Sequence, residues 1–351
     1  MTAERALRWA PGAAAVLVLA LAPLFFGDFY LSQVLTKALW LGIAATSLIF
    51  LAAYAGMVSL GQVALYGIAG FTMANLVTAD GGSDIAWSPW AGAIAGLLGA
   101  TALGLLFGAI SSRSYGIYFL MITLALAVLT YNFFGQVTQF SGFGGVNNVD
   151  TPSVVGNPVA NPEPLFYIAL GSAIAVYLFV RYVARTPFGL ALQGIRDDPA
   201  RMRALGYNVA LHRMLAFAVG ALIAAIAGVL SVWWNTRISP GSISLAQTID
   251  VLVIAVIGGL FRLEGAWVGA FVFAYLDNEM RGVALIGDRF NTVIGVIFLA
   301  IVLLSPGGLM GIWGSASDFV RRRTGAGRSR GGGEPLGGEK PRTAGQTPRA
   351  P

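Results

Sequence analysis

The chain has 351 residues, of which 56% are hydrophobic and only 11% are charged, whereas a soluble domain carries about 25% charged residues. It contains no cysteine and a single histidine, which excludes a disulfide framework, a thiolate metal site, a cysteine nucleophile and a multi-histidine metal cluster. Together with apolar runs close to the roughly 20 residues needed to cross a bilayer, this composition predicts an all-α, polytopic membrane helix bundle.

The net charge of +6 is carried by the segment from Arg321 onward, which holds eight basic and two acidic residues, whereas the rest of the chain is balanced. The charge therefore gives no reason to expect a nucleic-acid partner. Residues 321–351 are rich in Gly, Pro and Arg, and we predict a disordered basic cytoplasmic tail, because such a segment buries too little apolar surface to offset its ordering entropy. Its Arg321–Arg323 triplet is expected to contact anionic membrane lipid.

Apolar segments follow one another along the chain and predict about 8–10 transmembrane segments within a domain of residues 11–310. The first follows Arg5 and Arg8 as a signal peptide would, but no small-residue cleavage site lies at its polar end, GDFYLSQ. We therefore predict a retained span behind a cytoplasmic N-terminal segment, residues 1–10. The apolar segments are 11–29, 34–55, 57–78, 90–111, 115–137, 164–182, 213–234, 246–260, 265–280 and 289–305.

Two of these regions are too short or too rich in glycine to form regular spans. They are Gly56–Gly70 and Gly258–Gly269. Irregular backbone at membrane depth survives only where protein or a water-filled cavity covers it. We therefore predict broken or re-entrant helices here, which are candidates to line a translocation pathway.

Basic residues mark the side on which each loop lies. With alternating crossings from a cytoplasmic N-terminus, the outer side receives two long loops that contain four acids and no basic residue. This asymmetry follows the positive-inside rule and predicts that both termini are cytoplasmic. The basic residues assigned to the cytoplasmic side are Arg113, the six arginines between 181 and 213, Arg262 and Arg321–Arg323.

The second outer loop, Thr138–Pro164, is dense in Gly, Asn and Pro. These residues form turns and stop helices. We therefore predict an external loop here rather than a span.

The longest polar segment before the tail is Arg181–Arg213, which carries six arginines and two aspartates and lies between apolar runs. We predict that residues 184–212 form a cytoplasmic loop. On these residues alone, an ordinary basic loop and a docking site for a cytoplasmic partner are both open.

A short helix is predicted within this loop. Asp197 or Asp198, followed by Pro199, is typical of a helix start, with an Asx N-cap and a proline at the first helical position. The helix would cover Ala200–Leu205, and Gly206 would end it.

Polar side chains interrupt the apolar run after Gly56 at Ser59, Gly61, Gln62 and Tyr66. Gln62 and Tyr66 are four residues apart and share one helical face. Within a membrane these groups could bind a zwitterionic or amide solute, or they could bond neighbouring helices.

Asp250 opens the apolar run IDVLVIAVIGG. An ionisable residue within membrane reach is a functional candidate. The alternative is a structural ion pair near the outer boundary, with Arg237 as partner. We find no phosphate-binding loop, nucleophile elbow or carboxylate dyad, so no enzymatic activity and no cofactor bound by this chain are predicted.

Several stretches, in order and at matching spacing over about residues 30–310, resemble the LivM-like permease subunits of branched-chain amino acid ABC importers. The matching residues are Ser59–Gly61 with Gly67, Tyr118–Phe119 with Ile122–Leu124, Gly144–Asn147, Arg185–Gly189 with Ile195–Asp198, Ala204–Val209 with Ala216–Phe217, Ile238–Pro240, and Gly258–Gly259 with Gly265 and Gly269.

The resemblance implies a membrane permease in the bacterial inner membrane that works with four kinds of partner. These are a second, similar permease subunit, two cytoplasmic ATPase subunits that use ATP, an extracytoplasmic solute-binding protein and membrane lipid. It implies that Asn147 joins the pathway residues, and that the following residues couple to the ATPases: Arg196, Asp197, Asp198, Pro199, Arg201, Arg203 and Gly206.

Within the same family the resemblance also covers importers of urea, short amides and aromatic acids. The competing function is a secondary transporter or channel that works alone. The chain lacks the buried charged relay that ion coupling usually needs, which favours the importer.

Overall fold

The computed structural model describes residues 16–78, 87–158 and 160–281, together with positions 12, 14, 292, 293, 295, 296, 299, 303 and 308–311. The predicted N-terminal segment 1–10, the predicted tail 321–351 and most of the predicted span 289–305 lie outside the described residues.

The described residues are mostly helical and form no strand, and Val146 and Ile238 form an isolated antiparallel bridge. This confirms the all-α prediction. The elements are α2 (Ala22–Phe25), α3 (Asp28–Tyr30), η1 (Leu31–Thr36, π-helical), α4 (Lys37–Ala55), α5 (Gln62–Val77), α6 (Pro89–Ser111), α7 (Gly116–Gln136), α8 (Glu163–Val183), α9 (Pro187–Asp197), α10 (Pro199–Ala204), α11 (Val209–Asn235), η2 (Pro240–Ile243, a 3-10 turn), α12 (Leu245–Gly258) and α13 (Gly265–Arg281).

Five helices are long and apolar enough to cross a membrane: Asp28–Ala55, α6, α7, α8 and α11. Two shorter apolar helices, α5 and α12, accompany them. The Asp28–Ala55 helix and α11 are 94% and 78% buried over their apolar windows, against 33–39% for α6, α7 and α8. The first two therefore form the interior of a polytopic bundle, and the other three expose apolar faces, as lipid contact requires.

The first two apolar segments divide at a different place from the prediction. The chain breaks at Phe26 and Gly27, where both residues are extended. From Asp28 the helix then continues without interruption to Ala55, so the predicted boundary between 29 and 34 is wrong. A π-helical turn absorbs the polar residues there, with the Thr36 hydroxyl donating to the Leu31 carbonyl at 2.8 Å.

The predicted break after Gly56 is present. Gly56 ends α4 in the left-handed conformation, at φ +67°, and α5 begins only at Gln62. We call residues 56–61 the α4–α5 link. The second glycine-rich region forms a tight hairpin between α12 and α13. Its two backbones approach so closely that a Cβ at Gly258 would lie only 1.8 Å from the Gly265 carbonyl oxygen.

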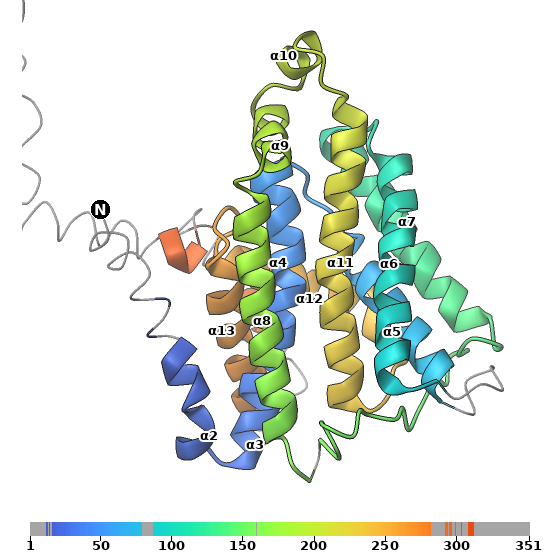
Figure 1. Ribbon diagram of the computed structural model, residues 1–351, viewed down its shortest axis with the longest axis vertical. Helices are drawn as coiled ribbons and strands as arrows, with labels where there is room; N and C mark the ends of the chain where they lie inside the picture. Colours follow the sequence, from blue (N-terminus) through green and yellow to red (C-terminus); the bar gives the residue numbers. More distant parts are fainter. Residues whose placement is uncertain are drawn as a thin grey trace, which may run out of the picture. The chain divides into compact units, whose positions relative to one another are not determined.

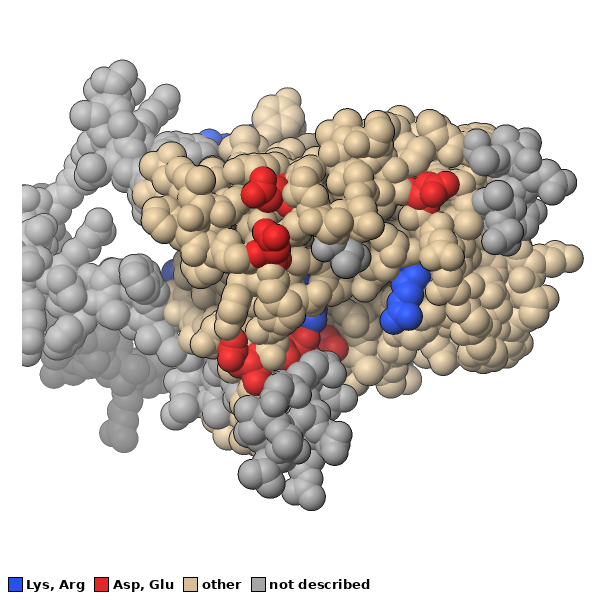
Figure 2. Space-filling view, turned by 90° about the horizontal axis from the view of Figure 1, so that it is seen from below, with Lys and Arg blue, Asp and Glu red and all other residues tan. Residues whose placement is uncertain are grey.

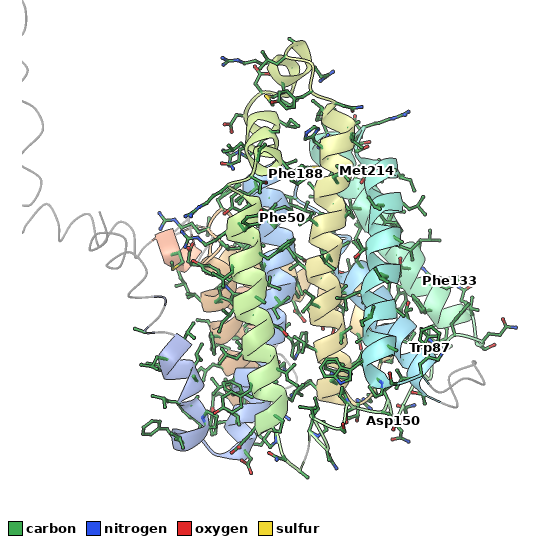
Figure 3. All side chains as sticks on the ribbon, viewed as in Figure 1. Phe50, Trp87, Phe133, Asp150, Phe188 and Met214 are labelled. Atoms are coloured by element: carbon green, nitrogen blue, oxygen red, sulfur yellow. The ribbon has the colours of Figure 1, made fainter. Side chains whose placement is uncertain are left out.

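The α10 helix and the loop between α7 and α8 lie at opposite ends of the bundle (Figure 1). Phe188 and Met214 are near the α10 end, and Trp87 and Asp150 are near the other (Figure 3). The loop is tied to the residues after α11, because Val146 and Ile238 exchange backbone hydrogen bonds of 2.8 and 2.9 Å. This arrangement agrees with the predicted placement of the two loops on opposite sides of a membrane.

Glycines let α5, α6 and α11 pack backbone to backbone. A Cβ at Gly228 of α11 would lie 2.1 Å from the Tyr66 carbonyl oxygen, and one at Gly96 of α6 would lie 2.5 Å from that of Ala69. Small residues promote such close approach between membrane helices, where no hydrophobic force drives helices together. The approach fixes the position of α5, which carries Gln62 and Tyr66.

We predict that Gly228→Ala destabilises the protein by about 1–3 kcal/mol, because the added methyl meets backbone that cannot move aside. The matched control is Gly171→Ala in α8, where a Cβ meets nothing within 4 Å. Thermal melting of the detergent-purified protein should show a lower midpoint for the first variant only. Equal midpoints would contradict the close α5–α11 contact.

Candidate functional site

The short helix predicted in the Arg181–Arg213 segment is confirmed as α10. Asp198 caps it, and its carboxylate accepts hydrogen bonds from the backbone N–H groups of Ala200 and Arg201 at 2.9 and 3.0 Å. The helix covers Pro199–Ala204, one residue earlier than predicted, and no residue in it is buried. Gly206 follows at φ +88°. A capped helix with no buried residue therefore projects from the bundle.

The helix that supports α10 was not predicted. In α9, Thr186 is the N-cap and accepts from the Gly189 N–H at 3.3 Å, and a proline follows at the first helical position. One face of α9 is buried through Leu192 and Ile195. The Thr-Pro pair is a helix start signal in the sequence, but the many arginines of the segment made it look like a polar loop without an apolar helix face. We call α9 and α10 together the arm.

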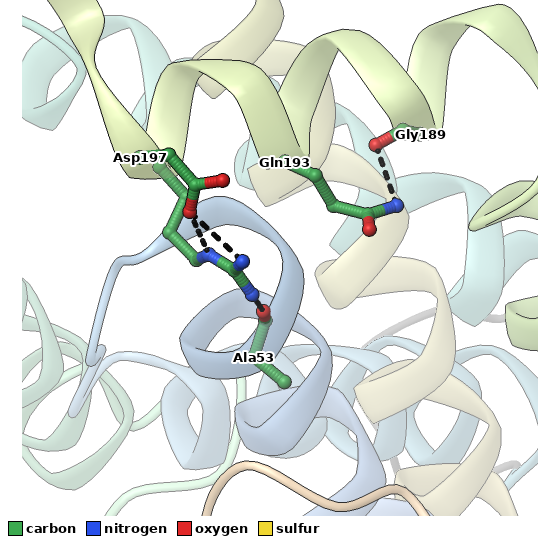
Figure 4. Close-up of polar contacts among 5 residues, drawn as sticks. Ala53, Gly189, Gln193 and Asp197 are labelled. Atoms are coloured by element: carbon green, nitrogen blue, oxygen red, sulfur yellow. Dashed lines mark hydrogen bonds and ion pairs between the residues drawn. The ribbon is translucent and has the colours of Figure 1, made fainter. Parts of the chain in front are cut away.

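Arg196 ties the arm to the end of α4. Its Nη1 donates to the Ala53 carbonyl at 2.5 Å, and its Nη2 lies 2.9 Å from Asp197 Oδ1 (Figure 4). The Arg196 stem also lies against Gly56, where a Cβ would be 2.7 Å from Cγ. Arg196 and Asp197, both in the predicted coupling set, thus hold the arm in place. Arg201 and Arg203 lie on the exposed α10 helix.

Arg213, at the start of α11, makes a second junction. Its side chain is buried, with 5% exposed. Nη1 donates to the carbonyls of Ser112 and Ser114 at 3.1 and 2.8 Å, and Nε donates to Met57 Sδ at 3.1 Å. The guanidinium also lies 4.2 Å from the centre of the Tyr115 ring. In the sequence Arg213 looks like one more loop arginine, because its acceptors are neutral groups 99 to 156 residues away.

Two neighbouring cavities lie between α4, α5, α11, α12 and α13. The larger measures about 180 Å³ and is lined by Lys37, Asp250 and Asp277 among other residues. It lies where α4 begins and α11 ends, opposite the arm. Figure 2, which views that end, shows acidic and basic side chains together there. The smaller cavity is lined by Gln62 and shares Trp40, Tyr66 and Gln247 with the larger.

The structure brings together three of the six predicted pathway residues, Gln62, Tyr66 and Asp250, which line these cavities. Ser59 is buried in the α4–α5 link, where its hydroxyl accepts from the Gly61 N–H at 3.1 Å. Ser59 and Gly61 therefore shape the turn before α5 and do not line either cavity. Asn147 is exposed in the outer loop and also lines neither.

Two residues that line the smaller cavity carry buried polar atoms without a partner. In the described part of the chain, both amide atoms of Gln62 and the indole nitrogen of Trp40 make no hydrogen bond, although the two residues are 2% and 5% exposed. Such a group costs about 1–3 kcal/mol, so each one in a native structure calls for an explanation, such as a bound polar molecule. The two side chains are therefore candidates to contact a polar solute.

An ion pair between Lys37 and Asp277 lines the larger cavity, and Lys37 also lies 5.9 Å from the centre of the Trp234 ring. Neither charge was among the predicted site residues. Lys37 is the one charged residue of α4, which is a signal of function, but its pairing joins residues 240 positions apart. Among the described residues, no group of three or more potential ligands is placed to hold a metal ion.

These features define a polytopic α-helical membrane protein with a polar cavity between its helices and an exposed helical arm at one end. A family model described as "Branched-chain amino acid transport system / permease component" matches residues 30–303. The chain therefore belongs to this family of transport permeases, which confirms the resemblance found in the sequence.

Individual relatives are distant. The chain is 24% identical to the high-affinity branched-chain amino acid transport system permease protein LivM of Escherichia coli K12, over 73% of this chain and 64% of the relative. It is 27% identical to a probable LivM of Methanocaldococcus jannaschii, over 60% and 66%, and 27% identical to LivH of E. coli K12, over 42% and 46%. The chain thus spans less than two thirds of the E. coli LivM. No solved structure matches.

We predict that Lys37 and Asp277 are coupled in stability. Lys37→Met or Asp277→Leu alone leaves one buried charge and should cost about 2–3 kcal/mol, somewhat below the 3–5 kcal/mol of a fully buried pair, because Lys37 keeps 20% of its side chain exposed. The double variant should cost less than either single one. Melting of all three proteins tests this, and purely additive losses would refute the coupling.

Proposed function

We propose that the chain is the translocating subunit of an ATP-driven importer, in a bacterial inner membrane, for a small polar solute and foremost for a branched-chain amino acid. The observation that carries the proposal is the arm: a capped helix with no buried residue, fixed to the bundle at the end opposite the polar cavity. A capped, projecting helix of this kind suits docking into a groove of another protein. The relatives named for branched-chain amino acid transport give the solute class.

The partners follow from this assignment. The chain would pair with a second permease, since both LivM and LivH proteins are among its relatives. Two ATPase subunits would bind at the arm end and use ATP, while this chain binds no cofactor of its own. A solute-binding protein would deliver solute at the opposite end, near the outer loop and the larger cavity. Both termini and the arm are then cytoplasmic.

The cavities would form part of the solute pathway. Lys37 and the two aspartates present charges of both signs to a zwitterion, and the unpartnered groups of Gln62 and Trp40 offer hydrogen bonds further inside. Within the docking surface, Arg201 and Arg203 supply positive charge, Asp198 and Pro199 begin the helix, and Gly206 ends it.

We predict that Gly206→Val prevents the ATPase subunits from co-purifying with the chain. A β-branched residue at φ +88° is strained by about 1–2 kcal/mol, which distorts the end of α10. Because no residue of α10 is buried in the bundle, membrane insertion should not change and the melting midpoint should change little. Gly156→Val is the matched control, since Gly156 also has a positive φ, +62°, and open space, but lies in the outer loop. Undiminished co-purification of Gly206→Val would refute the docking role.

We predict that Gln62→Leu lowers solute uptake without destabilising the protein. The change removes two buried polar atoms that have no partner, so the melting temperature should stay constant or rise. Asn132→Leu on the exposed face of α7 is the control. Uptake by reconstituted proteoliposomes with all partners and ATP provides the measurement. Uptake by the chain alone, independent of ATP, would favour a stand-alone transporter.

A further inference from the structure

The arm is held by one arginine on each side of α10, and both reach the same part of the chain. Arg196, before α10, binds the Ala53 carbonyl in the last turn of α4. Arg213, after α10, binds Met57 Sδ, within the α4–α5 link. The two contacts therefore bracket the point at which α4 ends and the link begins, although the arginines are separated by α10 and its flanking residues.

Arg213 also joins the link to the α6–α7 connection. Its carbonyl acceptors, Ser112 and Ser114, lie directly after α6, and the Tyr115 ring under its guanidinium precedes α7. An arginine suits such a junction because its planar fork serves several acceptors at once, whereas a lysine is a point charge on a flexible stem. One buried side chain thus fixes the start of α11 against two connections.

The α4–α5 link leads directly to the smaller cavity. The Thr123 hydroxyl accepts from the Leu60 N–H at 3.2 Å, which braces the link against α7. Two residues later Gln62 begins α5 and lines the cavity. A displacement of the arm that moves Ala53 and Met57 would therefore shift the first turn of α5, and with it the Gln62 side chain.

We propose that Arg213 and Arg196 are positioning residues that transmit displacement of α10 to the α4–α5 link and so to Gln62. The proposal rests on the proposed function, because it needs an ATPase that moves α10. It differs from that proposal in separating docking, which uses the exposed surface of α10, from transmission, which uses the two arginines on either side of it.

The test uses the full transporter with Arg213→Gln, and Arg185→Gln as control, because Arg185 is an exposed arginine of the same loop. We expect Arg213→Gln to retain ATPase co-purification and basal ATP hydrolysis, and to lose about tenfold in solute transported per ATP hydrolysed. Arg213→Lys should recover the ratio only in part, because the ammonium replaces one bond of the fork and not the set. An unchanged ratio in Arg213→Gln would overturn the proposal.

A second readout follows the link itself. Since the chain has no cysteine, Leu60→Cys introduces a single thiol into it, and the partner subunits are used in cysteine-free form. The rate of thiol labelling should change when ATP binds, and Arg213→Gln should abolish that change. A general loss of stability would not produce this pattern. If the change persists in Arg213→Gln, transmission does not pass through Arg213.

If Arg213→Gln fails to accumulate in the membrane, the same measurements on Arg196→Gln test the proposal. The Arg196 side chain is 38% exposed, and its loss leaves the buried contacts of Arg213 intact. We expect a lowered transport-to-hydrolysis ratio with docking retained, and an unchanged ratio would overturn the proposal. If the unaltered chain does not co-purify with ATPase subunits, it is the proposed function that fails. The two failures are therefore distinguishable.

Discussion

Between Gly56 and Gly61 the backbone leaves the helical conformation among membrane helices, and its polar groups must be satisfied within the protein. The Leu51 carbonyl accepts from the N–H groups of Gly56 and Met57, which closes the end of α4 in a Schellman-like turn. The Ser59 hydroxyl accepts from Gly61, and the Thr123 hydroxyl of α7 accepts from Leu60. The break in the helix is therefore stabilised by specific hydrogen bonds from α4, from the link itself and from α7.

This break allows α5 to be short. Its 16 residues extend about 24 Å, which is less than the roughly 30 Å hydrocarbon core. A short helix can place its first turn, with Gln62, inside the bundle instead of at the membrane surface. It stays there because glycines of α11 contact it closely. Gly228 lies against the Tyr66 carbonyl, and Gly220 lies against the Gln62 side chain. The polar cavity is a consequence of this packing.

Local chemistry was readable from the sequence, and long-range pairing was not. Asp198, Pro199 and Gly206 define α10 by caps and dihedral preferences that act over a few residues, so its prediction was accurate to one residue. The i, i+4 spacing of Gln62 and Tyr66 placed both on one face for the same reason. The burial of Arg213 depends on carbonyls that only the tertiary fold brings to it, and a basic loop residue looks the same before folding. The pairing of Lys37 with Asp277 was unpredictable on the same ground.

The position of α4 explains how the two ends of the protein can be coupled. Its last turn accepts the Arg196 hydrogen bond at the arm, and its first residue is Lys37 at the larger cavity. Because α4 is buried almost throughout, it cannot shift without moving its neighbours. A push at the arm can therefore reach the larger cavity along α4 and the smaller one through the α4–α5 link. Trp40 of α4 and Tyr66 of α5 stack with ring centres 6.0 Å apart and line both cavities. The two routes meet at that aromatic pair, so a relative movement of α4 and α5 would change the wall that both cavities share.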